Sequence, residues 1–262
     1  MDRDTYRQQE IDEWSAGDYR PVGRMLEPAA RMLVDRSGVG AGDRVLDVAT
    51  GSGTAAIAAA ETGASVVGVD ITDAVFDEGR RRAAEGDLDV TLQLGNAEEL
   101  PFDDDSFDAV ISSFGAIMAP DHGAVARELV RVCRPEGTIA LTAWPGDGSG
   151  TKLFGALMAH APPPPDFVEP LIGWGDEAHV RGLMEPLGVS LDFEPAGLPI
   201  AFPSIDAFEE VWFQNGPMVK TRETLGEMGS WEQAHTEFRA ALEAANEAAD
   251  GTFRMTWDYV IV

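Results

Sequence analysis

Two glycines and two aspartates between residues 45 and 70 have the types and spacing of a ligand site. The stretch from residue 45 to 54 reads VLDVATGSGT, an apolar run that passes into a turn with Gly51 and Gly53 and then into an alanine-rich segment. Glycines at such a turn allow tight backbone geometry and let a ligand approach the main chain. Asp47, beside this turn, suits a ligand that carries positive charge. The stretch therefore predicts a binding site for a small charged molecule.

Asp70 ends the second apolar run of the chain, VVGVD. A carboxylate at the carboxyl edge of a parallel strand can accept both hydrogen bonds from a ribose diol. The alternative role for Asp70 is a helix cap, but Thr72 or Asp73 could supply that cap. We therefore interpret Asp70 as a ribose-binding residue.

The pattern Gly-x-Gly-x-x-Ala with a later acid also fits a dinucleotide site, so an NAD-dependent oxidoreductase is an alternative. Asp47 disfavours it, because a carboxylate beside a helix N-terminus is a poor neighbour for a pyrophosphate. The same carboxylate suits a ligand with an ammonium and a sulfonium group.

The elements that would position these residues alternate between short β-branched runs and helical stretches, the pattern of a parallel sheet covered by helices on both faces. The expected strands of the first half are 44–49, 65–69, 90–94, 108–112 and 138–143. After Trp144 we expect helices over 152–160 and 177–187, a strand over 189–193, helices between 198 and 250, and a last strand over 253–262. The expected division is a helical lid segment (1–39, with a helix from about Leu26 to Ser37 and Pro28 near its start), a ligand-binding core (40–145) and a C-terminal part with a helical insertion (146–262).

Composition excludes several classes of partner. The formal net charge is −27, from 46 acidic and 19 basic residues, and only Lys152 and Lys220 are lysines. Nucleic acids and anionic lipids bind through Lys/Arg patches, so neither is an expected partner. No stretch is long and apolar enough for a membrane span and the N-terminus lacks a signal-peptide pattern, so we expect a cytoplasmic protein. The acid excess indicates either a salt-rich cytoplasm or a GC-rich genome.

The cysteine and the histidines suggest no metal chemistry. Cys133, the single cysteine, lies in an apolar run and is interpreted as a buried structural thiol. The four histidines show no metal-ligand spacing, so no metal is predicted.

Four stretches in order, VLDVATGSGTAA, VVGVD, LGNAEELPFDDDSFDAVISSFG and LVRVCRPEGTIALTAW, resemble the cofactor motifs of class I S-adenosylmethionine-dependent methyltransferases, particularly the ubiquinone/menaquinone-biosynthesis C-methyltransferase branch. The resemblance covers about residues 40 to 145. It implies a Rossmann-like, mostly parallel seven-stranded sheet, to which the sequence pattern adds an N-terminal helical lid and a helical insertion before the last strand. It departs from the family's usual pattern at Thr50-Gly51-Ser52-Gly53 and at Asn96, where an acid is usual.

The resemblance also implies a role for each matching residue. The methionine part of S-adenosyl-L-methionine would lie against Asp47, Gly51, Ser52 and Gly53, and the ribose against Asp70 and Ile71. Asn96 and Ala97 would frame the adenine, and Ser113 and Phe114 would form the floor after the fourth strand.

Methyl transfer from a sulfonium needs mainly alignment of the reactants and exclusion of water. A base helps only where the acceptor is a phenol, an enol or a similar acid, and His122 is the best-placed candidate. We expect an acceptor pocket built from Trp14, Tyr19, Phe114, Met118 and Trp144, and a small apolar or aromatic acceptor. A cofactor-binding accessory protein without catalysis is the alternative of a different class.

Overall fold

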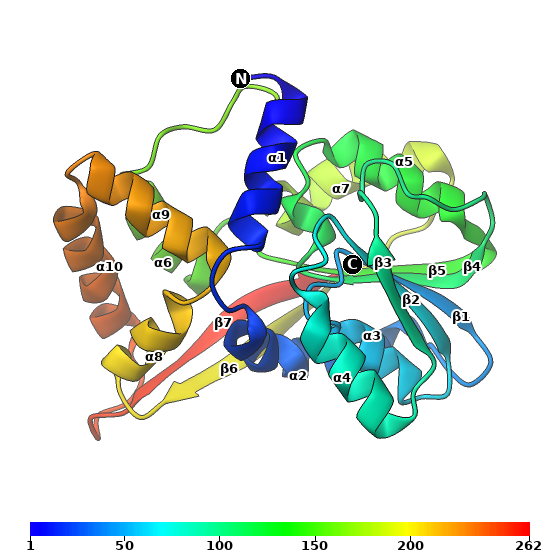
Figure 1. The fold of residues 1–262 in the computed structure, drawn as a ribbon, viewed down its shortest axis with the longest axis horizontal. Helices are drawn as coiled ribbons and strands as arrows, with labels where there is room; N and C mark the ends of the chain where they lie inside the picture. Colours follow the sequence, from blue (N-terminus) through cyan, green and yellow to red (C-terminus); the bar gives the residue numbers. More distant parts are fainter.

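Seven strands form one sheet in the computed structural model, which describes residues 1–262 (Figure 1). The strands are β1 (Arg44–Val48), β2 (Ser65–Asp70), β3 (Val90–Leu94), β4 (Phe107–Ser113), β5 (Cys133–Ala143), β6 (Glu194–Phe202) and β7 (Phe253–Ile261). Their order is β3-β2-β1-β4-β5-β7-β6; the first five strands pair in parallel, and β7 runs antiparallel to both β5 and β6. The expected mostly parallel, seven-stranded, Rossmann-like sheet is confirmed.

Helices cover both faces of this sheet. Figure 1 shows α2 (Arg20–Ser37), α3 (Thr54–Ala60) and α4 (Phe76–Gly86) on one side, and α5 (His122–Val132) and α7 (Glu177–Met184) on the other. Beside the β6–β7 pair lie α6 (Ser149–Met158), α8 (Ile205–Trp212), α9 (Gly216–Glu227) and α10 (Trp231–Ala245). Short 3₁₀ helices occupy Ala116–Met118, Leu171–Gly175 and Glu185–Leu187. Because α8, α9 and α10 join β6 to β7, they are the expected helical insertion before the last strand.

The sixth strand lies later in the chain than expected. Residues 189–193 have no regular structure, and β6 covers Glu194–Phe202, where a helix was predicted from residue 198. This run contains Pro195, Gly197 and Pro199, which disfavour a central strand. β6 is the outermost strand and pairs only with β7, so its prolines remove no bond to a second neighbour.

The N-terminal segment contains two helices with different roles. α1 (Arg3–Trp14) has no buried residue, whereas α2 buries Leu26, Ala30 and Leu33 in the core. The expected start of α2 near Leu26 is wrong, because the helix begins at Arg20 and contains Pro28 in its interior. The buried apolar face compensates for the backbone hydrogen bond that Pro28 cannot donate. The range 1–39 therefore includes a core helix as well as α1.

None of the helices combines the length and the apolar character needed to cross a bilayer.

Cys133 is buried, and its thiol lies 3.7 Å from the carbonyl oxygen of Thr138. Burial raises the pKa of this thiol to about 11. A thiol with this pKa is a poor nucleophile near neutral pH, so Cys133 has the structural role that its sequence context predicts.

The melting temperature should rise when KCl is increased from dilute buffer to about 1–2 M. Even if every Lys and Arg is paired, 46 acids against 19 cations leave a large unpaired negative charge, and salt screens its self-repulsion. Salt also weakens exposed ion pairs such as Arg31 with Glu61, at 2.7 Å, but each of these contributes only about 0–1 kcal/mol. Thermal melts over a KCl series test the expectation, and a flat or falling curve would show that repulsion among the acids does not limit the stability of the fold.

Candidate functional site

The carboxyl ends of β1, β2 and β4 meet at one edge of the sheet, and the glycine turn after β1 lies there. Gly51 and Gly53 both have positive φ, of 54° and 78°. A Cβ on Gly53 would lie 3.1 Å from Cα of Gly79 in α4, so this glycine lets α3 and α4 approach closely. The turn thus gives α3 its starting geometry and leaves the main chain at Gly51 open to one side.

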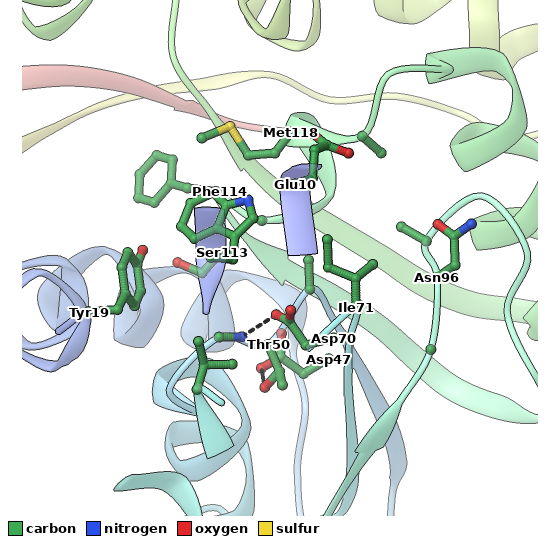
Figure 2. Close-up of a pocket in the computed structure, with 18 of the residues that line it drawn as sticks. Glu10, Tyr19, Asp47, Thr50, Asp70, Ile71, Asn96, Ser113, Phe114 and Met118 are labelled. Atoms are coloured by element: carbon green, nitrogen blue, oxygen red, sulfur yellow. Dashed lines mark hydrogen bonds between the residues drawn. The ribbon is translucent and has the colours of Figure 1, made fainter. Parts of the chain in front are cut away.

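A pocket opens over this edge, and side chains of α1, among them Glu10, line it (Figure 2). Figure 2 shows Asp47 and Asp70 at its base, Tyr19 and Asn96 on opposite sides, and Phe114, Met118 and Glu10 facing them. The predicted site residues that line it are Trp14, Tyr19, Asp47, Gly51, Ser52, Asp70, Ile71, Asn96, Ala97, Ser113, Phe114 and Met118. Residues far apart in the sequence therefore share one cavity, as the motif order implied.

Asp47 is a buried carboxyl with one oxygen unpaired. Its Oδ2 accepts hydrogen bonds from the Thr50 hydroxyl (2.6 Å) and from the backbone N–H of Ala56 (2.9 Å), while Oδ1 is buried without a partner. Burial raises its pKa to about 7, and the neighbouring charge of Asp70 adds to the effect. A buried acceptor without a donor is costly, so a cationic or N–H group of a ligand would be stabilised here.

Asp70 connects the end of β2 to the glycine turn. Its Oδ2 accepts from the backbone N–H of Gly51 at 2.9 Å and its Oδ1 accepts from that of Thr72 at 3.4 Å. Burial raises its pKa to about 6 even though backbone N–H groups favour the charged form. α4 begins only at Phe76 and has no side-chain cap, so Asp70 does not cap it. Each of its oxygens keeps lone-pair capacity for a further donor.

Two non-glycine residues with positive φ border the pocket, Ala49 at 53° and Phe114 at 58°. This conformation costs about 1–3 kcal/mol per residue, so neighbouring contacts must hold it. The Ser112 hydroxyl donates to the carbonyl of Val48 at 2.6 Å, and the Thr142 hydroxyl accepts from the N–H of Phe114 at 2.9 Å. Hydroxyl side chains at the ends of β4 and β5 therefore fix the wall of the pocket.

Part of the lining comes from α1 and is not identified by sequence reasoning. Arg3, Tyr6, Arg7 and Glu10 of this helix line the pocket together with the predicted Trp14. These positions recur at intervals of one, three or four residues, the pattern of one helix face. Because the face mixes charged and aromatic residues, a search for apolar periodicity does not find it.

Glu10 is the carboxyl of α1 whose pKa is shifted most. Burial raises its pKa to about 8, and the negative charges of Glu13 and Glu98 contribute. The Tyr6 hydroxyl and the Arg7 guanidinium act in the opposite direction. A carboxyl in an aromatic-lined cavity with a pKa near neutrality can exchange a proton with a bound molecule.

Two predicted residues lie behind the lining. Trp144 was expected in the acceptor pocket, but it stacks on Phe114 with ring centroids 3.8 Å apart and does not itself line the cavity. Gly53 also lies outside the lining, because its role is the contact with Gly79. Both support the pocket from the second layer of residues.

The expectation that His122 is a base of the pocket needs correction. Its side chain is fully buried at the start of α5 and does not line the cavity. Its Nδ1 lies 3.0 Å from Nε2 of His179, and its pKa is lowered by burial. The sequence places His122 just after the fourth-strand loop, but the helix turns the imidazole away from the pocket and toward α7.

Comparisons with known proteins agree with this geometry. A family model described as a methyltransferase domain matches residues 45–137. An uncharacterized protein of Mycobacterium tuberculosis is 35% identical over 252 residues, which cover 95% of this chain and 91% of that one. A demethylmenaquinone methyltransferase of Mycobacterium sp. (strain KMS) is 34% identical over 167 residues, 58% of this chain and 70% of that one.

Solved structures show the same fold. The YcgJ protein of Bacillus subtilis superposes with a TM-score of 0.58 at 21% identity, over 89% of this chain and 96% of that one. The phosphoethanolamine N-methyltransferase 2 of Haemonchus contortus, in complex with S-adenosyl-L-methionine, gives 0.54 at 20% identity, over 89% and 51%. Together with the matched domain and the curated relatives, the seven-stranded sheet and its glycine turn identify the chain as a member of the class I S-adenosylmethionine-dependent methyltransferases.

Proposed function

We propose that this chain binds S-adenosyl-L-methionine over the glycine turn and methylates a small aromatic or apolar acceptor held beneath α1. The observation that carries the proposal is a single pocket with two different ends. One end presents the buried carboxyls of Asp47 and Asp70, with the Tyr19 ring close to Gly51, and the facing side presents the aromatic ring of Phe114 and the thioether of Met118.

The acidic end fits the cofactor chemically. The unpaired, buried Oδ1 of Asp47 suits the positively charged methionine part, and the free lone pairs of Asp70 suit the ribose hydroxyls. The side-chain oxygen of Asn96 accepts from the backbone N–H of Glu98 at 3.0 Å, and its N–H₂ group remains available to a ligand. An adenine ring nitrogen is a suitable acceptor for that amide.

S-adenosyl-L-methionine, when bound, supplies a methyl group on a positively charged sulfur, which is an activated leaving group. The protein's own contribution is therefore to orient the acceptor and to exclude water. The rings of Phe114 and Trp144 stack, which stiffens the wall against which an acceptor ring would lie. Glu10, in our proposal, takes a proton from an acceptor hydroxyl or similar acid.

The test of this function is formation of S-adenosylhomocysteine from S-adenosyl-L-methionine with a panel of phenols and quinols. Turnover with an aromatic member of the panel is expected. Cofactor binding without turnover across phenols, quinols, amines and thiols would instead favour an accessory protein. NADH is titrated in parallel, and tight NADH binding would support the dinucleotide alternative.

We propose that α1 is a lid over the pocket and that ion pairs between α1 and the pocket edge hold it in place. Arg3 lies 3.4 Å from Asp121 and 3.9 Å from Glu98, and Arg7 lies 3.7 Å from Glu98. Exposed pairs contribute about 0–1 kcal/mol each, so the double variant Arg3→Gln/Arg7→Gln should release S-adenosylhomocysteine roughly two- to tenfold faster. Stopped-flow fluorescence measures the release rate.

Arg80→Gln is the control, because Arg80 is an exposed arginine of α4 outside the pocket. The effect should shrink in about 1 M KCl, where the screening length is about 3 Å. An unchanged release rate in the double variant would mean that these pairs do not hold the helix.

A further inference from the structure

Two histidines and a glutamate from three separate segments meet on the side of α5 away from the pocket lining. His122 begins α5, His179 lies in α7, and Glu169 lies in the segment that joins α6 to the 3₁₀ helix at residue 171. One nitrogen of each imidazole and one oxygen of the carboxylate all lie within 4.8 Å of one another. We propose that these three side chains bind a divalent transition-metal ion, for which zinc is the best fit.

The spacing of the two imidazoles is close to that of a metal site. Nδ1 of His122 and Nε2 of His179 are 3.0 Å apart. Two nitrogens that each lie about 2.0–2.1 Å from a tetrahedral zinc ion are about 3.3 Å apart. The rings would therefore separate by only a few tenths of an ångström to admit the ion.

The facing nitrogens of His122 and His179 compete for one proton, and both rings are held close together in the fold. Nε2 of His122 is buried without a hydrogen-bond partner, and its ring is fully enclosed. Of the two facing ring nitrogens, only one can carry a proton if they share a hydrogen bond. A metal ion between the facing nitrogens would accept a lone pair from both rings, and His122 would then carry its proton on its buried Nε2.

The carboxylates nearby have distinct roles. Oε2 of Glu169 accepts from the backbone N–H of His122 at 2.7 Å, which orients the carboxylate beside the rings and leaves Oε1 free. Asp121 and Asp176 accept from backbone N–H groups as the N-caps of α5 and α7. Glu169 is therefore the third ligand, and the two aspartates set the helix ends that carry the histidines.

Ligand chemistry selects the class of ion. Two imidazoles and one carboxylate suit zinc and its neighbours, whereas magnesium and calcium favour sites made entirely of oxygen. Gly173 leaves the space that the rings occupy, because a Cβ there would lie 3.1 Å from His179 and 3.2 Å from His122. Three protein ligands leave a fourth position for water.

The ion would connect α5 and α7 to the segment that carries Glu169, and this segment contacts both the pocket wall and α1. The backbone N–H of Glu169 donates to the carbonyl of Pro120, a residue of the pocket wall, at 3.0 Å. In the same segment, Phe167 packs edge-on against Tyr6 of α1 with ring centroids 5.6 Å apart, and the guanidinium of Arg3 lies 5.2 Å from its ring. We therefore assign the ion a structural role, and the inference does not depend on which acceptor is methylated.

The test uses the full chain after treatment with a chelator, with Zn²⁺ and Co²⁺ as probes. Calorimetry should show one equivalent of Zn²⁺ per chain, and Co²⁺ should give the visible absorption of a four-coordinate site. At free Zn²⁺ of about 100 times the dissociation constant, the melting temperature should rise by roughly 5–10 °C.

His179→Ala and Glu169→Gln should each weaken Zn²⁺ binding by more than about 100-fold, because loss of even an outer-shell partner costs about 10- to 100-fold. His235→Ala should bind as the wild type does; His235 is also partly buried and lies 3.2 Å from a glutamate, Glu209, but it is outside the cluster. A cooperative thermal melt without metal, at the melting temperature of the metal-free wild type, shows that each variant is folded.

Absence of saturable Zn²⁺ binding by the wild type would overturn the proposal and leave a hydrogen-bonded histidine pair. Binding that His179→Ala and Glu169→Gln leave unchanged, or that His235→Ala weakens equally, would place the ion elsewhere and would overturn it as well.

Discussion

Asp70→Ala is expected to weaken the binding of S-adenosylhomocysteine by about tenfold to several hundredfold. Hydrogen bonds to a charged group contribute about 1.5–3 kcal/mol each, and water replaces part of two such bonds in the variant. Asp70 is 9% exposed, so the bonds form away from bulk solvent. Calorimetric titration of wild type and variant measures the difference.

The structure also shows that Asp70 holds the glycine turn, since it accepts from the N–H of Gly51. Asp70→Asn keeps an acceptor oxygen for Gly51 and removes the charge, so it separates the loss of ribose bonds from a disturbed turn. Asp73→Ala is the matched control, because Asp73 is exposed, three residues further on and outside the pocket. Equal affinity in wild type and both Asp70 variants would refute the ribose assignment.

Removal of the Asp70 carboxyl should not unfold the protein. Burial raises its pKa to about 6, which means that folding disfavours its charged form. A carboxyl with a raised folded-state pKa stabilises the fold only at low pH, and this contribution is lost as the pH rises through about 6. At neutral pH the Asp70→Ala substitution should therefore change the free energy of unfolding little, and thermal melts of wild type and variant measure this difference.

The parallel half of the fold follows from local sequence patterns. Each of the first four strands is a short β-branched run bounded by turn residues and lies within one residue of its expected position, whereas β5 ends as expected at Ala143 but begins at Cys133 rather than Thr138. β6 could not be located in this way, because its prolines and glycine are tolerated only at the sheet edge, and edge position is a property of the whole sheet. The start of α2 was missed because Pro28 resembles a helix start when the buried face is not known.

In the site, too, the residues that local sequence identifies differ from those whose position depends on tertiary packing. Gly51, Asp47 and Asp70 are identified from sequence because each follows a strand directly, and strand ends converge at one edge. The orientation of His122 could not be predicted, since it depends on how α5 packs against α7. The contact between His122 and His179 could not be predicted either, because the two residues are 57 positions apart in the chain. Metal-ligand spacing along the sequence detects only local ligands, so the expectation of no metal did not consider this cluster.

Glu10→Gln is expected to lower turnover by about 100- to 10,000-fold if the acceptor must lose a proton. The substitution keeps the size and the hydrogen-bonding oxygen of the side chain but removes its ability to accept a proton. Glu10 lines the pocket, and no residue of α1 is buried in the core, so the variant should fold normally. Initial rates at saturating acceptor and cofactor, compared with thermal melts, separate catalysis from stability.

Deletion of residues 1–14 should lower turnover at least as much as Glu10→Gln does, because it removes Glu10 together with the rest of α1. The melting temperature should change little, since no residue of α1 is buried in the core.

The dependence of the rate on pH distinguishes a proton-accepting role of Glu10 from a merely structural one. Its pKa is raised to about 8, so below that pH the carboxyl is mostly protonated and cannot act as a base. The ratio kcat/KM should therefore rise with pH through about 8 in the wild type, and Glu10→Gln should lose this rise. Because the charge of Glu13 helps to raise the pKa of Glu10, Glu13→Gln should keep activity and shift the rise to lower pH. A profile that keeps the same rise in Glu10→Gln would assign the titration to another group and leave alignment alone to account for the rate.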